Sequence, residues 1–264
     1  MEIRKNIQTN RFYGREPRIL WIYNQPISDE FPRLFEGFWE VYEAWYYHGE
    51  RVEGGLSSFL FDTTLPLAEQ HWKRERFGNY LYGALISVFF SWDYLQAVKT
   101  KRSMGKIQDD LAFILQINGT VRYLFTALDA LACCIYIAED MIPPGHQQAQ
   151  AEPAFRKLSI KTLKQKIKVD SAYSSLDSLV NRVEFKYLAE YRNLLTHRPF
   201  PQFSIDSSGY HFPESLVQLD SITQLAQQYL QPDVGNCLGS AFEMIEADLE
   251  AALPELGARY QSRI

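Results

Sequence analysis

The chain has 264 residues, of which 46% are hydrophobic and 14% aromatic, and its formal net charge is −5 at pH 7. This length is enough to bury a sizeable core in one large domain or two small ones. The acidic balance argues against a protein that wraps a long nucleic acid over a broad basic surface, although it leaves room for a small basic pocket.

The three cysteines are Cys133, Cys134 and Cys237, and two of them are adjacent in an apolar run. This number and placing predict buried thiols in a reducing cytosol. Cysteines and histidines do not occur at the spacings of a zinc site, and no glycine-rich phosphate loop is present, so we expect neither a metal nor a cofactor.

The beginning of the chain does not have the apolar core of a signal peptide. The longest apolar run, residues 121–138, is interrupted by Arg122 and Asp129, which argues against a membrane span. We therefore expect a cytoplasmic protein that has no membrane partner.

Residues 1–30 have no clear helical pattern and predict an N-terminal arm, whereas residues 31–264 predict one helical domain. Apolar residues at steps of three and four predict a first helix over residues 31–47 and a longer one over about residues 67–101. Gly54 and Gly55 begin the loop between these two helices.

The next predicted helix begins near Asp109 and Asp110, whose charge suits a helix N-terminus, and ends near Met141. Its predicted inner stripe consists of Leu124, Leu128, Leu131 and Ile135. Gly119 either weakens this helix or marks a close crossing with a neighbouring one.

The remaining helices are predicted near residues 162–167, 173–197, 216–230 and 237–253. Proline and glycine predict a plain loop over residues 143–153 and an irregular connection of about twenty residues after His197. No alternation is sustained enough for a sheet. The sequence therefore predicts an all-α fold, a bundle of about five to seven helices.

The segment 173–197 has its apolar residues on one helical face, namely Leu176, Val180, Val183, Tyr187 and Leu194. Pro199 disfavours helical geometry at Arg198, so this helix should end at or just after His197. Arg192 and His197 are about 140° apart around an ideal helix, and a terminating turn would bring their side chains together.

Arg192, Asn193 and, after three further residues, His197 form a pattern that resembles the signature of the HEPN superfamily of all-helical domains. Members have an arginine, usually a polar residue directly after it, and a histidine that follows a gap of four to six residues. Many are metal-independent ribonucleases, and others have lost activity and serve as binding modules. The resemblance implies a HEPN-like bundle with Arg192, Asn193 and His197 as its catalytic residues.

These residue types suit metal-independent RNA cleavage. Histidine transfers protons near neutral pH, and the arginine fork stabilises charge on the phosphate. By analogy with the family, Asn193 would orient His197 or the phosphate. Two protomers of that family pair to combine their motifs, which implies a homodimer that acts on RNA and leaves a 2′,3′-cyclic phosphate and a 5′-hydroxyl.

The same resemblance implies a toxin or phage-defence effector, with an antitoxin or a regulatory protein as a further partner. Toxins paired with a nucleotidyltransferase antitoxin often carry a tyrosine two residues after the histidine. This chain has Pro199 at that position, which argues against control by modification there.

Two other interpretations remain open. The chain could be a catalytically inactive HEPN-like module that binds a nucleotide, RNA or protein partner, or a structural dimer in which Arg192 and His197 lock the helix end. In the latter, Arg192 would pair with Glu184, Glu190 or another carboxylate. Candidate acids that could support the site are Asp62, Asp93 and Asp129.

Overall fold

The computed structural model describes residues 37, 38, 40–42, 45, 65–103, 110–143, 146, 148–166, 173–197, 204–206, 209–211 and 234–263. Apart from one small hairpin, the regular elements in this part of the chain are α-helices. The all-α prediction is therefore confirmed. The predicted arm over residues 1–30 and the predicted helix over residues 216–230 lie outside the described residues.

The core of the fold is the pair formed by α4 (Leu65–Ser103) and α5 (Asp110–Ala138), which pack along each other more extensively than any other two described elements. Both helices begin and end close to the predicted residues. The predicted inner stripe of α5, from Leu124 to Ile135, is buried. A Cβ atom on Gly119 would lie 2.8 Å from a ring carbon of Tyr94, so this glycine marks a close crossing of α5 with α4.

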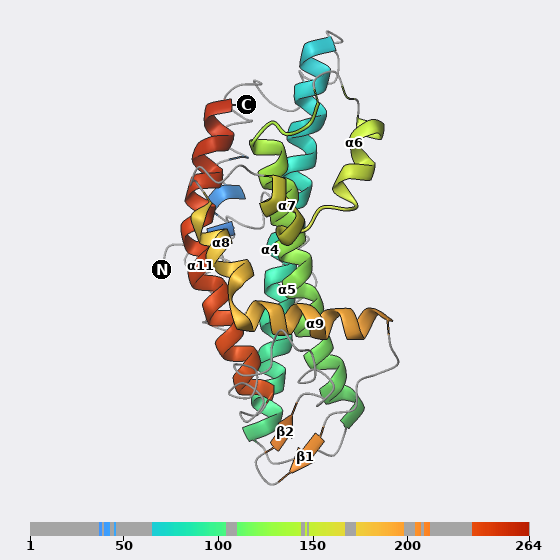
Figure 1. The fold of residues 1–264 in the computed structure, drawn as a ribbon, viewed down its shortest axis with the longest axis vertical. Coiled ribbons are helices and arrows are strands. Elements are labelled where there is room, and N and C mark those ends of the chain that lie inside the picture. The colour runs from blue at the N-terminus through green and yellow to red at the C-terminus, as the bar shows by residue number, and fades with distance from the viewer. Residues whose placement is uncertain are drawn as a thin grey trace, which may run out of the picture.

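The third long helix is α11 (Val234–Arg263), which runs beside α4 and α5 along the long axis of the molecule (Figure 1). It is longer than the predicted helix over residues 237–253. Pro254 lies inside this helix and does not end it. Pro254 is on the exposed face, whereas Leu256, two residues later, is fully buried in the core. Burial of the apolar face therefore outweighs the helix-breaking tendency of one surface proline.

A short helix replaces the loop predicted over residues 143–153: α6 (Gln148–Phe155) contains Pro153. Ala151 and Phe155 are buried, four residues apart on one face, and the Phe155 ring lies 5.3 Å from that of Tyr80 on α4. An ion pair of 2.9 Å between Arg76 and Glu152 also joins α6 to α4. These long-range contacts favour the helix, and the loop prediction was wrong from residue 148 onward.

The predicted helix over residues 173–197 is two helices, α8 (Ser174–Asn181) and α9 (Val183–His197). Arg182 separates them with an extended backbone, at φ −61° and ψ 143°. As a result, α9 turns away from α8 and crosses the long helices (Figure 1). The end of the helix at His197 is as predicted.

The connection after His197 contains two short strands, β1 (Ser204–Asp206) and β2 (Gly209–His211), which pair antiparallel. The prediction of a wholly irregular connection was therefore wrong at this point. The short helix α7 (Ile160–Lys166) precedes α8, two residues earlier than predicted. Its first turn is capped reciprocally, because Ser159 Oγ accepts the backbone N–H of Thr162 and Thr162 Oγ1 accepts that of Ser159.

Within the described residues, one segment, Ala112–Ala138 of α5, is long and apolar enough to cross a membrane, and 72% of its most apolar stretch is buried inside the protein. Helices surround this segment: α4, α7, α9 and α11 all contact α5. Such a central helix is expected to be apolar on most sides.

Candidate functional site

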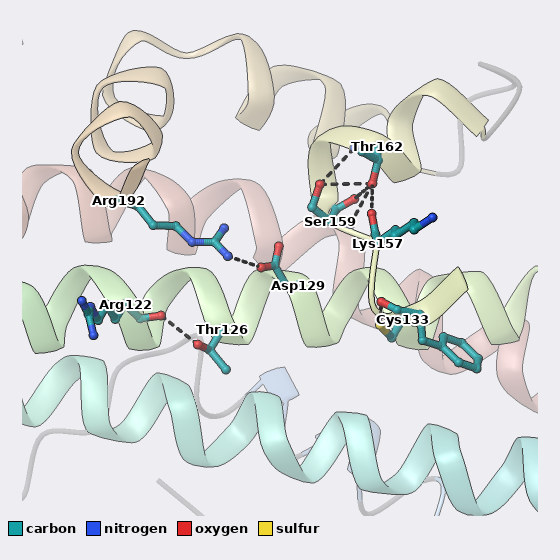
Figure 2. A network of polar contacts seen from close by, with 9 residues as sticks. Arg122, Thr126, Asp129, Cys133, Lys157, Ser159, Thr162 and Arg192 are labelled. Carbon is teal, nitrogen blue, oxygen red and sulfur yellow. Dashed lines mark hydrogen bonds and ion pairs between the residues drawn. The ribbon is translucent and has the colours of Figure 1, made fainter. Parts of the chain in front are cut away.

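Arg192, the arginine of the predicted motif, forms an ion pair with Asp129 of α5. Arg192 Nη2 lies 2.8 Å from Asp129 Oδ2. Figure 2 shows the arginine side chain reaching from α9 to the carboxylate on the facing side of α5. The exposed fraction is 39% for the Arg192 side chain and 26% for that of Asp129, so both groups are within reach of solvent.

An aromatic ring also holds the guanidinium group. The Cζ atom of Arg192 lies 5.2 Å from the ring centre of Phe125, within the range of a cation–π contact. The Phe125 ring is buried, and its centre lies 5.4 Å from that of the Phe185 ring. Phe185 precedes Arg192 by about two turns of α9. Phe125 and Asp129 are four residues apart on α5, so the ring and the carboxylate fix the guanidinium from the same helix.

Tyr191 determines where α9 rests on α5. Its ring is fully buried, and its hydroxyl donates a hydrogen bond of 2.7 Å to Asn118 Oδ1. Burial raises the pKa of this hydroxyl, and the nearby charge of Arg122 opposes the shift only in part. The tyrosine therefore remains a neutral donor, and its bond to α5 positions the next residue, Arg192.

The start of α9 is held by a second ion pair. Arg182 donates from Nε and Nη2 to the two carboxylate oxygens of Asp248 on α11, in the bidentate arrangement that suits a guanidinium and a carboxylate. Asp248 is buried. This contact accompanies the extended backbone at Arg182, so it fixes the direction in which α9 leaves α8.

The other two residues of the motif lie further along α9. Asn193 is exposed. His197 is the last residue of the helix, and its side chain lies outside the described part of the chain. Because α9 remains helical through His197, the backbone of His197 lies about 7.5 Å along the axis from that of Arg192 and about 140° around it.

Burial controls the electrostatics of Asp129. Desolvation raises the pKa of its carboxyl group above the usual 3.8, and both the charge of Arg192 and its hydrogen bond oppose that shift. Cys133, one turn further along α5, has a pKa raised to about 12, mainly by burial and further by the charge of Asp129. The Cys133 thiol is therefore neutral, and Arg192 is the charged group that compensates Asp129.

The sequence indicates Asp129 only as one of three candidate supporting acids, and the alternative partners it offers for Arg192 are Glu184, Glu190 or another carboxylate. The structure brings Asp129 to Arg192. Asp93 is exposed on α4, and Asp62 lies outside the described residues. A signal was available in the sequence, because a carboxylate in the most apolar helix of a chain requires a partner. Phe125 carried no such signal, since an aromatic residue in an apolar stripe is ordinary.

Across the described ranges, no group of three or more His, Cys, Asp or Glu side chains is arranged to hold a metal ion. Comparison of the chain with protein-family models, with curated proteins and with solved structures finds no match.

Proposed function

We propose that this protein is a metal-independent endoribonuclease of the HEPN type, with Arg192, Asn193 and His197 as its catalytic residues. The observation that carries the proposal is the placing of Arg192. Its guanidinium is half-exposed, oriented by Asp129 and Phe125, and fixed on a helix that ends at His197. A guanidinium oriented in advance can bind a phosphate without first losing side-chain freedom.

Each motif residue has a role that its position favours. Arg192 binds the scissile phosphate and stabilises the charge that develops on it. His197 transfers a proton, a role that suits histidine because the unperturbed pKa of an imidazole lies near neutrality. Asn193 is exposed beside Arg192 and orients the phosphate or the imidazole.

The helical geometry of α9 favours a site shared by two protomers. Because Arg192 and His197 are about 140° apart around the helix, a phosphate on Arg192 is more easily reached by a histidine that approaches from a second chain. We therefore propose a cytoplasmic homodimer that acts as a toxin or phage-defence effector, controlled by an antitoxin or another regulatory protein.

The test compares wild-type protein with Arg192→Ala and His197→Ala on total cellular RNA in the presence of EDTA. We expect each substitution to lower the cleavage rate by about 10²–10⁴-fold. Matched controls are Arg156→Ala, whose side chain is 78% exposed, and His146→Ala, which removes a half-buried histidine outside the motif. Both controls should cleave like the wild type.

The ends of the products test the mechanism. Mass spectrometry should find a 2′,3′-cyclic phosphate and a 5′-hydroxyl. A 3′-hydroxyl end, or equal cleavage by wild type and His197→Ala, would contradict the proposal. Light scattering of the purified protein should give the mass of two chains.

One observation favours a second function, that of a catalytically inactive module that binds a nucleotide, RNA or protein. Arg192 already has a carboxylate and an aromatic ring as partners, which is also how a purely structural arginine is held. In that case neither the wild type nor Arg192→Ala would cut RNA, while Arg192→Ala would still bind a fluorescent oligoribonucleotide more weakly than the wild type.

A further inference from the structure

We propose that Asp129 is the general base of this cleavage, and that its carboxylate takes the proton of the ribose 2′-hydroxyl next to the phosphate that Arg192 binds. The inference rests on the proposed function. It assigns the second proton-transfer group, which one histidine cannot easily supply in a single step.

Position is the first argument. Asp129 Oδ2 lies 2.8 Å from Arg192 Nη2. A phosphate oxygen that accepts a bond from the same guanidinium would lie about 2.9 Å from it. The carboxylate and the phosphate are then neighbours on one planar group, and the 2′-hydroxyl of the same nucleotide is adjacent to that phosphate.

Charge is the second argument. Two anions, a carboxylate and a phosphate, repel each other unless a cation lies between them. Arg192 is such a cation, because a guanidinium presents five N–H donors on a planar fork and can contact two anions on different edges. The ion pair with Asp129 uses one of its terminal nitrogens.

Reactivity is the third argument. The Asp129 side chain is 26% exposed, so a hydroxyl group can reach it. Burial raises the pKa of its carboxyl group, and a less acidic carboxyl has a more basic carboxylate. Among the described residues, the titratable groups that act on Asp129 or respond to its charge are the charged Arg192 on α9 and the neutral thiol of Cys133 on α5.

The step balances within the substrate and two side chains. The 2′-oxygen attacks phosphorus and forms the new O2′–P bond while its proton moves to Asp129. The P–O5′ bond breaks, and the leaving 5′-oxygen takes a proton from the His197 imidazolium. The products are a 2′,3′-cyclic phosphate and a 5′-hydroxyl, after which Asp129 loses its proton to water and His197 regains one.

A substrate with an activated leaving group separates the base from the acid. In an oligoribonucleotide whose 5′-bridging oxygen is replaced by sulfur, departure needs no proton from an acid. Relative to wild type, we expect His197→Ala to cleave this substrate at least about tenfold better than it cleaves ordinary RNA. Asp129→Asn should show no such gain.

The pH profile separates catalysis from positioning. We expect Asp129→Asn to lower the cleavage rate by about 10²–10⁴-fold and to abolish the rise in rate on the acidic side of the profile. Asp129→Glu, which keeps a carboxylate, should retain that rise. The matched control is Asp140→Asn in the turn just after α5, where Asp140 pairs with Lys73 and has a left-handed backbone that asparagine tolerates.

The possible results test separately whether Asp129 is the base and whether the protein is a ribonuclease. If wild type cleaves RNA and Asp129→Asn cleaves it at a similar rate with an unchanged acidic limb, the assignment of the base is wrong and the nuclease stands. Rescue of Asp129→Asn by the sulfur substrate would also overturn the assignment, because it would make Asp129 the acid. If wild type cuts no RNA, the proposed function fails and the inference fails with it.

Discussion

The hydroxyl group of Tyr191 donates a hydrogen bond of 2.7 Å to the side-chain oxygen of Asn118, and both residues are buried where α9 crosses α5. Arg192 follows Tyr191 directly, so this bond between two helices determines where the guanidinium lies. A single buried polar pair thus connects the packing of the core to the candidate site.

Tyr191→Phe should lower the free energy of unfolding by about 1–3 kcal/mol, because the buried amide of Asn118 loses its partner. For a chain of this size each kcal/mol lowers the melting temperature by about 2–4 °C. Urea unfolding measures the change. The double variant with Asn118→Leu should cost less than the sum of the two single changes, since it removes both polar groups; strict additivity would show that the two side chains do not interact.

The pH dependence of stability tests the environment of Asp129. Its folded-state pKa is raised above the usual 3.8, so the folded protein binds more protons than the unfolded chain in the window that begins near that value and extends upward to the raised pKa. Stability contributed at this site is therefore lost as pH rises through the window.

The quantity to compare is the difference in free energy of unfolding, wild type minus Asp129→Asn. We expect this difference to decrease as pH rises through that window. Urea titrations at successive pH values measure the difference. A difference that increases with pH would mean that the ion pair with Arg192 outweighs burial and that the folded-state pKa lies below the usual value.

Two glycines in the packed pair α4 and α5 should respond oppositely to alanine. A Cβ on Gly119 would lie 2.8 Å from a ring carbon of Tyr94, whose ring is stacked on Tyr123, whereas a Cβ on Gly83 has nothing within 4 Å. Gly119→Ala should therefore destabilise the protein by about 1–3 kcal/mol through overpacking. Gly83→Ala should stabilise it by roughly 0.5–1 kcal/mol, because alanine favours the helix. Equal effects in thermal unfolding would contradict the close crossing at Gly119.

The ion pair between Arg182 and Asp248 should contribute to stability because Asp248 is buried. Asp248→Ala should lower the free energy of unfolding by roughly 1–3 kcal/mol, a value between those of exposed and buried pairs. Glu243→Ala, an exposed residue of the same helix, serves as the control and should change stability by less than about 0.5 kcal/mol. If both variants unfold at the same urea concentration, the pair does not stabilise the junction of α8 and α9.

The long helices were predictable because local signals specify them. In α4 and α5, apolar residues recur at helical steps over many turns, and the inner stripe from Leu124 to Ile135 is buried as its spacing indicated. Pro199 likewise indicated the end of α9 at His197. Periodicity and a proline stop act within a few residues of chain, so the sequence alone carries them.

The predictions that failed depended on contacts between distant residues. α6 forms in a Gln/Ala stretch with Pro153 because Phe155 packs on Tyr80 and Glu152 pairs with Arg76. The break at Arg182 accompanies its pairing with Asp248, 66 residues away. No local pattern encodes either partner.

The sequence by itself determined that this chain is helical, where the two long helices α4 and α5 run, and which arginine and histidine mark the end of α9. Only the tertiary structure decided that Arg192 meets Asp129, 63 residues earlier in the chain. The physical reason is that helical periodicity assigns a side chain to a face, whereas the partner of a charged group depends on which helices cross and at what height. Here the buried contact between Tyr191 and Asn118 fixes that height.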